Sequence, residues 1–301
     1  MNVTAEGDKY SIHFRHDWTG RLCFMLGIID VGGGNRGAFG AGVLDYCMDH
    51  GIMADYCIGV SAGSANCVSY IAGQRGRNYR FYTKYNISDD AISLKNRLTN
   101  HALVNLDYIF STVSNDDGAD PLDYTSFAES SQKCFIVATD AESGKPVYFT
   151  KKDIHRNDYR VLAASCNLPA VNCAYEYNHH RYFDGGLSDP IPVEKAFRDG
   201  CDKVIVILTL PKTYFRNAGR DRHLARLVRS CPNIRAAFES RAALYNAQLN
   251  RILEYEKENK VLIIAPKSKP ELDTLGKDSA EIRRVYEEGY EEASDIPYFM
   301  E

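Results

Sequence analysis

Two apolar, strand-like runs alternate with two helix-like runs between residues 23 and 71, and this order constrains the fold more than any other feature. The first strand is expected at 23–31, where an apolar run closes on glycines, and a helix should follow at 38–50. A second strand is expected at 56–60 and a second helix at 62–71. Such an order is typical of a parallel sheet with right-handed crossovers. The sequence therefore predicts an α/β fold with a mainly parallel central sheet.

The same reasoning extends the sheet and its helices along the chain. Residues 73–132 are polar and rich in turns, and we expect them to form an insertion around the mouth of a site. Further strands are expected at 135–139, 147–150, 171–183 with a break at 178–180, 203–208 and 261–265. Further helices are expected at 159–166, 193–198, 221–230, 233–258 and 278–293. We divide the chain into an N-terminal arm (1–23), a main domain (24–210) and a mostly helical C-terminal extension with one late strand (211–301).

Composition places the chain among soluble globular proteins. Its 301 residues are 45% hydrophobic and 25% charged, which suits one large domain with appendages, or two domains. The net charge of −4 gives no general attraction to nucleic acid, so no nucleic-acid partner is expected. The longest apolar runs, such as 204–208, are too short to span a bilayer, and the polar start of the chain predicts no signal peptide.

The cysteines indicate a reducing compartment. The nine of them are scattered along the chain: Cys23, Cys47, Cys57, Cys67, Cys134, Cys166, Cys173, Cys201 and Cys231. Their number is odd, and no C-x-x-C pair or Cys/His cluster occurs. We therefore expect reduced thiols in a cytoplasmic protein, without disulfides and without a zinc site.

The pattern Gly59-Val60-Ser61-Ala62-Gly63 joins the second expected strand to the second expected helix. A strand that reverses so abruptly into a helix needs glycine where a Cβ would collide with the adjacent backbone. The turn would lift the Ser61 hydroxyl above the sheet edge, near a helix N-terminus whose positive partial charge favours a developing anion. Ser61 is therefore a candidate nucleophile, with Gly59 and Gly63 completing its motif. The alternative is a Gly/Ser-rich turn that caps an ordinary helix.

A glycine-rich loop, residues 32–37, follows the first expected strand and fits the G-x-G-x-x-G pattern. One interpretation is a dinucleotide site, but an acidic residue should then close the second strand, and none occurs at 59–61. We favour an oxyanion hole, in which the amides of Gly33 and Gly34 meet the negative oxygen of a tetrahedral intermediate. Arg36 could add charge there, or it could be a structural side chain that bonds loop carbonyls. The candidate oxyanion-hole residues are Gly32, Gly33, Gly34, Arg36 and Gly37.

A serine nucleophile needs a proton acceptor. His179 and His180 lie in an expected turn and His223 in a basic helical stretch, so each is more typical of a surface histidine than of a base. Asp184, with Gly185 and Gly186 after it, ends a strand-like run, although plain Asp-Gly turns are common. Burial would raise the pKa of this carboxyl and improve it as a base. We therefore expect Asp184 to take the Ser61 proton and later to activate water.

Taken in order, these three motifs resemble those of the patatin-like phospholipase family. Residues 163–170, Ala-Ala-Ser-Cys-Asn-Leu-Pro-Ala, are similar to the family's Ala-Ser-x-x-x-Pro segment, which precedes its Asp-Gly motif. The resemblance covers residues 24–210. Two departures are mild: Arg36 stands where members have Lys or Arg, and the third motif is Asp-Gly-Gly instead of the also common Asp-Gly-Ala.

The resemblance implies a three-layer α/β/α sandwich and a Ser-Asp dyad in place of a triad. It implies Ser61 as nucleophile, Asp184 as base, and Gly33, Gly34 and Arg36 at the oxyanion. It also implies hydrolysis of acyl esters, typically of lipids, without a metal or cofactor. The expected partner is therefore a lipid or acyl-ester substrate. The alternative is a catalytically silent lipid-binding or regulatory protein on the same fold.

The stretch 212–251 is strongly basic, with nine Lys or Arg against two acidic residues. One helical face would carry Leu224, Leu227, Val228 and Cys231, flanked by Arg222, Arg226 and Arg229. A basic amphipathic helix of this kind can lie on an anionic lipid surface, which would make the protein peripheral at a membrane. The alternative, which we favour, is a helix packed on the domain, because most amphipathic helices are simply half-buried.

Overall fold

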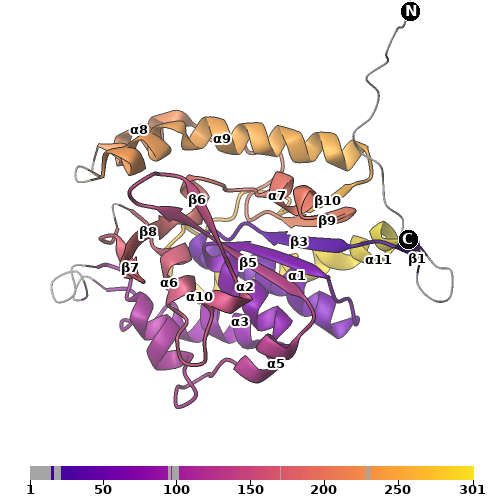
Figure 1. Cartoon of the computed structure of the whole chain (residues 1–301), viewed down its shortest axis with the longest axis horizontal. Helices are drawn as coiled ribbons and strands as arrows, with labels where there is room; N and C mark the ends of the chain where they lie inside the picture. Colours follow the sequence, from indigo (N-terminus) through magenta and orange to yellow (C-terminus); the bar gives the residue numbers. More distant parts are fainter. Residues whose placement is uncertain are drawn as a thin grey trace, which may run out of the picture.

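One eight-stranded sheet runs through the computed structural model and carries helices on both faces (Figure 1). Along the sheet the strand order is β10–β9–β3–β4–β5–β8–β7, and β6 pairs with β5. These strands are β3 (Leu26–Asp30), β4 (Tyr56–Val60), β5 (Lys133–Asp140), β6 (Pro146–Thr150), β7 (Tyr175–Tyr177), β8 (His180–Asp184), β9 (Lys203–Ile207) and β10 (Val261–Ile264). The run from β10 to β5 is parallel, whereas β6, β7 and β8 pair antiparallel. The expected α/β class with a mainly parallel sheet is confirmed.

The structure describes residues 15–16, 22–93, 96, 102–169, 171–226, 228 and 231–301. Of the expected N-terminal arm (1–23), only β1 (Arg15–His16) and β2 (Leu22–Cys23), a separate antiparallel pair, lie within the described residues.

The helices form a layer on each side of the sheet (Figure 1). One face carries α7 (Val193–Arg198), α8 (Ala218–Ala225) and α9 (Pro232–Lys257). The other face carries α1 (Ala38–Asp49), α2 (Ala62–Ile71), α3 (Arg77–Arg80), α5 (Tyr124–Glu129), α6 (Arg160–Cys166), α10 (Ser279–Glu292) and α11 (Ile296–Met300). The expected three-layer sandwich is therefore also confirmed.

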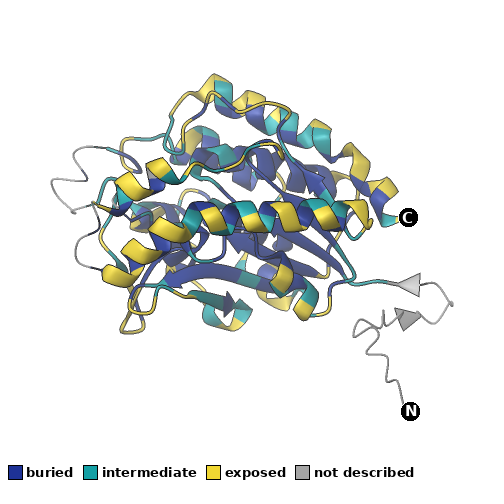
Figure 2. Cartoon of the chain, turned by 90° about the horizontal axis from the view of Figure 1, so that it is seen from above, coloured by how far each residue is buried: buried dark blue, intermediate teal, exposed yellow. Residues whose placement is uncertain are grey.

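Alternate residues of the central strands enter two different cores. Ile28 and Cys57 pack with the layer of α1 and α2, whereas their neighbours Ile29 and Ile58 pack with the layer of α7 and α9. Successive side chains of a strand point to opposite faces, so a strand covered on both faces is apolar throughout. Figure 2 shows the strands buried and the outer helix surfaces exposed. This explains why the strands read as continuous apolar runs in the sequence.

The residues 211–301, expected as an extension, pack on both sides of this sheet. Strand β10 pairs with β9 and so lengthens the sheet, while α9 covers one face. On the opposite face α10 packs along α1, where the Tyr286 hydroxyl donates to Asp45 at 2.7 Å. The C-terminal residues therefore share both cores of the main domain.

Several expected elements match the structure residue for residue, including the strand at 56–60 and the helices at 62–71 and 193–198. The first strand begins at Leu26 and not at Cys23, because Cys23 belongs to β2. The helix expected at 221–230 begins earlier, since Asn217 caps it by accepting from the Gly219 amide at 2.7 Å. None of the helices within the described ranges is long and apolar enough to cross a membrane.

Candidate active site

Ser61 stands at the turn between β4 and α2, and its backbone conformation is unusual. Its φ is 56° and its ψ −132°, a region that residues other than glycine seldom occupy. Such strain is typical of a serine that a strand-to-helix turn holds up as a nucleophile. The turn is also tight, because a Cβ added to Gly59 would lie 2.3 Å from the Ser64 Cα. The expected sharp turn is therefore present, with Ser61 at its apex.

Helix α6 fixes this turn through one hydroxyl. The Ser61 amide donates to the Ser165 Oγ at 3.0 Å, and that hydroxyl donates to the Val137 carbonyl of β5 at 2.6 Å. Two residues further on, the Asn167 carbonyl accepts from the Asp184 amide at 2.8 Å. One short segment thus holds both the serine and the aspartate. The sequence singled out this segment, residues 163–170, without indicating what it does.

Asp184 ends β8, with its side chain buried beside the serine turn. Its Oδ1 accepts from the Gly186 amide at 2.8 Å, while Oδ2 is buried and has no hydrogen-bond partner among the described residues. Burial raises the pKa of the Asp184 carboxyl, and Arg241, the Ser61 hydroxyl and the Gly186 amide partly offset that rise. The Ser61 hydroxyl is therefore one of the groups near this carboxyl that favour its charged form. A carboxyl with a raised pKa is a better base for a hydroxyl.

The glycine loop lies against the serine turn. Gly32, Gly33 and Gly34 all have positive φ, of 63°, 132° and 61°. Gly33 and Gly34 are half-exposed, line the same cavity as Ser61 and Asp184, and donate no amide hydrogen bond to the described residues. These two amides are therefore available to a ligand. Gly37 does not line that cavity, because it packs behind the loop against the Tyr82 hydroxyl.

A loop from the far end of the sequence supports the glycines. The Thr274 carbonyl accepts from the Asn35 amide at 2.8 Å, and its hydroxyl accepts from Arg36 at 3.1 Å. On the opposite side Asp30 accepts from the Gly32 amide at 2.9 Å, and burial raises the pKa of Asp30 to about 6. Arg36 thus contacts the Thr274 hydroxyl and also lines the outer cavity, so its role at the oxyanion stays a prediction. Sequence reasoning missed Thr274 and Asp30 as supports, since neither lies in a motif.

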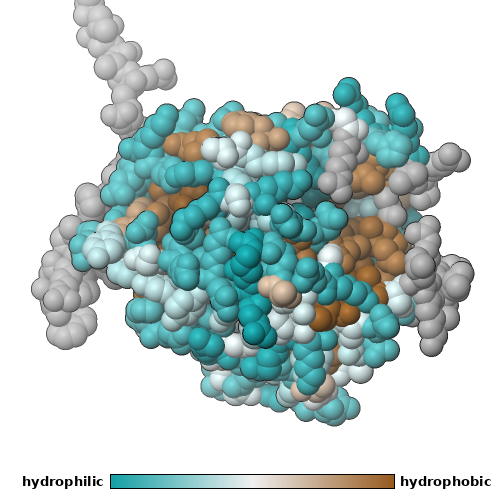
Figure 3. Space-filling model, turned by 180° about the vertical axis from the view of Figure 1, so that it is seen from behind, coloured by the Kyte–Doolittle hydropathy of each residue, from teal (hydrophilic) through white to brown (hydrophobic). Residues whose placement is uncertain are grey.

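Two cavities meet at Ser61. The outer one, of about 530 Å³, is bounded by Ser61, Asp184, the glycine loop and polar side chains from residues 209–275. The inner one, of about 80 Å³, is mostly apolar and includes Phe81, Ile109, Phe110 and Leu162. On the face that Figure 3 shows, apolar side chains gather in patches toward both ends of the molecule. An ester at Ser61 could therefore place its two halves in different surroundings.

The inner cavity is not apolar throughout. Arg77, Asn86 and Tyr159 line it, and the Arg77 Nε, the Asn86 Oδ1 and the Tyr159 hydroxyl are buried without a hydrogen-bond partner in the described part of the chain. The Arg77 Nε does lie 3.8 Å from the Asp120 carboxylate, with which it forms an ion pair. Buried polar atoms of this kind usually bind water. The apolar part of the inner cavity therefore ends at these polar groups, and this limits how long an apolar ligand can be.

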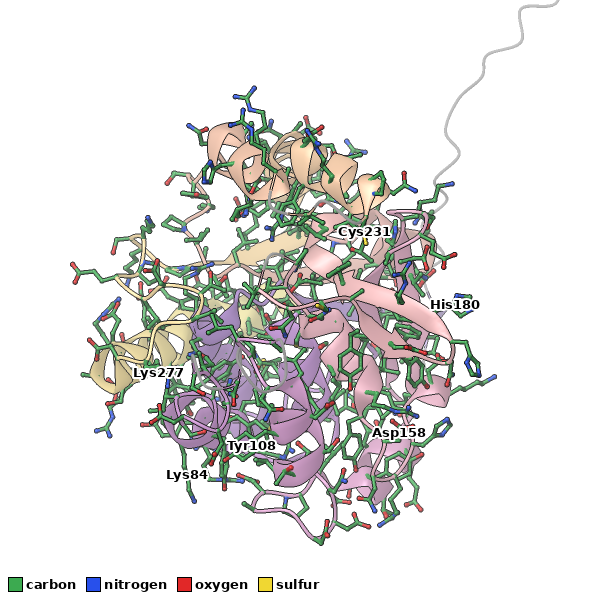
Figure 4. The ribbon with its side chains drawn as sticks, turned by 90° about the vertical axis from the view of Figure 1, so that its left-hand side faces the viewer. Lys84, Tyr108, Asp158, His180, Cys231 and Lys277 are labelled. Carbon is green, nitrogen blue, oxygen red and sulfur yellow. The ribbon has the colours of Figure 1, made fainter. Side chains whose placement is uncertain are left out.

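Histidine does not take part in this arrangement. Among the described residues, none that lines either cavity is a histidine. His179 lies in the exposed turn between β7 and β8, and His180 begins β8, where Figure 4 shows it at the outer surface. His223 is exposed on α8. The carboxylate is thus the candidate base that the fold brings to the serine.

Comparison with known proteins places two parts of the chain in known families. Residues 31–197 match the family model described as Patatin-like phospholipase, and residues 231–296 match one described as a domain of unknown function, DUF6363. "Uncharacterized protein YjjU" of Escherichia coli (strain K12) is 28% identical over 195 residues, which are 63% of this chain and 53% of that protein. The chain thus spans about half the length of this curated relative. The structure of VipD from Legionella pneumophila aligns with 98% of this chain and 71% of that one, with a TM-score of 0.46 and 10% identity.

Proposed function

Because the chain belongs to the patatin-like phospholipase family, we propose that it is a serine acyl-ester hydrolase that acts on lipids. In this proposal Ser61 is the nucleophile, Asp184 the base, and the amides of Gly33 and Gly34 the oxyanion hole. One observation supports it most directly: a strained serine and a buried carboxylate meet in one cavity beside two unbonded glycine amides.

The chemistry would proceed in two halves. The Ser61 Oγ bonds to the acyl carbon as its proton passes to Asp184, and the amides of Gly33 and Gly34 stabilise the oxyanion. The bond to the alcohol then breaks as the alcohol takes the proton from Asp184. In the second half water attacks the acyl-serine, Asp184 takes its proton, and the fatty acid leaves as Ser61 recovers a proton.

The inner cavity suits the acyl chain, since it begins at Ser61 and its walls are mainly apolar. Burying methylene groups there contributes about 0.8 kcal/mol each. The outer cavity, which is larger and more polar, suits the alcohol part of the ester.

Labelling with a fluorophosphonate probe tests the assignment. The wild-type protein should be labelled, Ser61→Ala should not, and Asp184→Asn should react about 10²–10⁴ times more slowly. Ser240→Ala, at an exposed serine on α9, is the matched control and should react like wild type. No labelling of the wild-type protein would favour the silent lipid-binding alternative, and labelling of Ser61→Ala would place the nucleophile elsewhere.

The position of α8 supports packing on the domain over contact with a membrane. Val228 and Cys231 of the expected apolar face are buried in a cluster shared with α9, and Leu224 packs against it, so this face already has a partner. Leu227 and Arg229 of the expected amphipathic face lie outside the described residues. Peripheral membrane contact and a cytoplasmic location stay predictions, and co-sedimentation with anionic vesicles would test the first.

A further inference from the structure

Residues 231–296, which match a family without an assigned function, supply part of the wall of the outer cavity. Arg241 of α9 reaches the turn after Asp184, where its Nε donates to the Gly186 carbonyl at 2.8 Å. A Cβ built on Gly186 would lie 3.0 Å from the Asp184 Oδ1 and 3.4 Å from the Arg241 Nη2. The guanidinium and the candidate base therefore flank the same residue.

Arg241 is fixed at one nitrogen and open at the other two. Within the described residues neither Nη1 nor Nη2 donates a hydrogen bond, and neither is buried away from solvent. The side chain is half-buried and lines the outer cavity. A planar guanidinium with both terminal nitrogens open can bind two oxygens of a phosphate or carboxylate at once.

Arg216 is a second cation on the same wall, and it is held rigidly. Its Nε and Nη2 donate to the fully buried Asp221 at 2.7 and 3.0 Å. Its backbone is bound to Asn246 of α9 in both directions, at 2.7 and 3.0 Å. Such a group loses little further freedom when a ligand arrives, which favours affinity.

Positive charge at this wall is only partly balanced. Burial lowers the pKa of Arg241 to about 10, and Arg216 and Arg36 lower it further while Asp184 and Asp221 oppose them. Arg241 therefore stays charged at neutral pH, although two other guanidinium groups repel it. Asp221 already pairs with Arg216. An anion in the cavity would relieve this repulsion.

We propose that Arg241 and Arg216 bind the phosphate of an acyl glycerophosphate in the outer cavity while its acyl chain occupies the inner one. This rests on the proposed function, because Ser61, which lines both cavities, would then face the ester between the two groups. The substrate class is a lysophospholipid whose phosphate lies a few bonds from the ester. The C-terminal residues thereby set the headgroup specificity of the site.

A matched pair of substrates tests this. 1-Octanoylglycerol 3-phosphate and 1-octanoylglycerol share the acyl chain and the glycerol and differ only in the phosphate. We expect wild-type kcat/KM to favour the phosphate, and this preference should fall about 10- to 100-fold in Arg241→Gln, mainly through KM. Arg241→Lys keeps the positive charge but loses the paired N–H donors of the guanidinium, so it should retain part of the preference for the phosphate substrate. An unchanged ratio in Arg241→Gln would overturn the proposal.

Arg235→Gln is the control, because Arg235 lies on the same helix, is exposed and pairs with Glu239 at 3.1 Å. It should leave the substrate ratio unchanged. Arg216→Gln should lower the ratio as Arg241→Gln does, and thermal unfolding of each variant shows whether the protein is folded. If Arg241→Gln lowered kcat/KM equally for both substrates, Arg241 would only support Asp184, and the proposed phosphate subsite would be overturned.

Binding separates this proposal from the hydrolase itself. Calorimetry should show that the Ser61→Ala variant binds octyl phosphate. The double variant with Arg241→Gln should bind it about 10- to 100-fold more weakly. This readout needs no turnover, so it tests the subsite even if neither ester is hydrolysed. Inorganic phosphate should bind much more weakly than octyl phosphate, and equal affinities would overturn the lipid assignment in favour of a free anion.

Discussion

Asp184 of β8 pairs with Ala138 of β5, and Val60 of β4 pairs with Val137, the residue just before Ala138. Strand β6 occupies the other edge of β5 over residues 135–139, so β4 and β8 share a single edge, end to end. Because β4 ends at Val60 and β8 ends at Asp184, the next residue after β4, Ser61, lies beside Asp184. Sheet register alone thus brings Ser61 to Asp184 across 123 positions of sequence.

The pH dependence of hydrolysis should report the Asp184 carboxyl. It can accept a proton only when ionised, so kcat/KM on a neutral ester should fall as pH drops through its raised pKa. We expect the midpoint of this acid limb above the ordinary aspartate value of about 3.9. A pH-rate profile with a p-nitrophenyl ester measures it, and a midpoint at or below the ordinary value would contradict the role of Asp184.

Asp30 also titrates in this range, because burial raises its pKa to about 6. Arg241→Gln separates the two groups. Arg241 lowers the pKa of Asp184, so its removal should shift an Asp184 limb to higher pH, whereas Arg241 does not act on Asp30. If the midpoint of the acid limb did not move in Arg241→Gln, that limb would report a group other than Asp184.

Gly34→Ala should damage the site far more than a similar change elsewhere. A Cβ at Gly34 would lie 2.1 Å from the Thr274 carbonyl oxygen, at a φ of +61°. Gly51 has a similar φ of +66° but nothing within 4 Å, so Gly51→Ala has the backbone strain without the clash. We expect Gly51→Ala to cost about 1–2 kcal/mol of stability with activity retained. Gly34→Ala should cost more and abolish activity, as thermal unfolding and ester hydrolysis would show; equal effects would contradict the support by Thr274.

Ser165→Ala should loosen the serine turn. It leaves the Ser61 amide without its acceptor and the Val137 carbonyl without its donor, at a cost of about 1–3 kcal/mol. We expect kcat to fall while KM changes little, since the substrate cavities keep their walls. Denaturant unfolding and steady-state kinetics measure both effects, with Ser240→Ala as the exposed control, within about 0.5 kcal/mol of wild type. Full activity in Ser165→Ala would mean that the turn holds its shape without α6.

Acyl-chain preference should follow the inner cavity. Its volume of about 80 Å³ holds roughly six water-sized groups at 10–15 Å³ each. We therefore expect a p-nitrophenyl ester series to peak near six carbons. Ile109→Ala enlarges the cavity and should move the peak to longer chains, with a loss of about 2–5 kcal/mol of stability. Ile252→Ala, at a buried site on the other face of the sheet, should lose similar stability without moving the peak.

The fold and the central pair of the site were predictable because both follow from local patterns. Strands buried on both faces read as apolar runs, and the turn at Ser61 is fixed by glycines within two residues of it. Asp184 followed from its place at a strand end and from the resemblance.

The supporting residues were not predictable for an equally physical reason. Ser165 belongs to a segment that the resemblance singled out, but its role could not be predicted, because that role depends on where β4 and β5 end. The helix that carries Arg241 was expected, but periodicity does not say which of its faces meets a site 57 residues earlier in the chain. Such contacts between distant segments arise from packing, which one sequence does not encode in any short stretch.

The contact between Thr274 and the glycine loop has a consequence for biosynthesis. A ribosome that has reached residue 210 has already made Ser61, Asp184 and the loop, but not the segment to which Asn35 and Arg36 bind. The nascent polypeptide thus contains Ser61, Asp184 and the glycine loop well before it contains the Thr274 segment that supports this loop. The support of the glycine loop is therefore completed only after residue 274 has been made and the late segment has joined the fold.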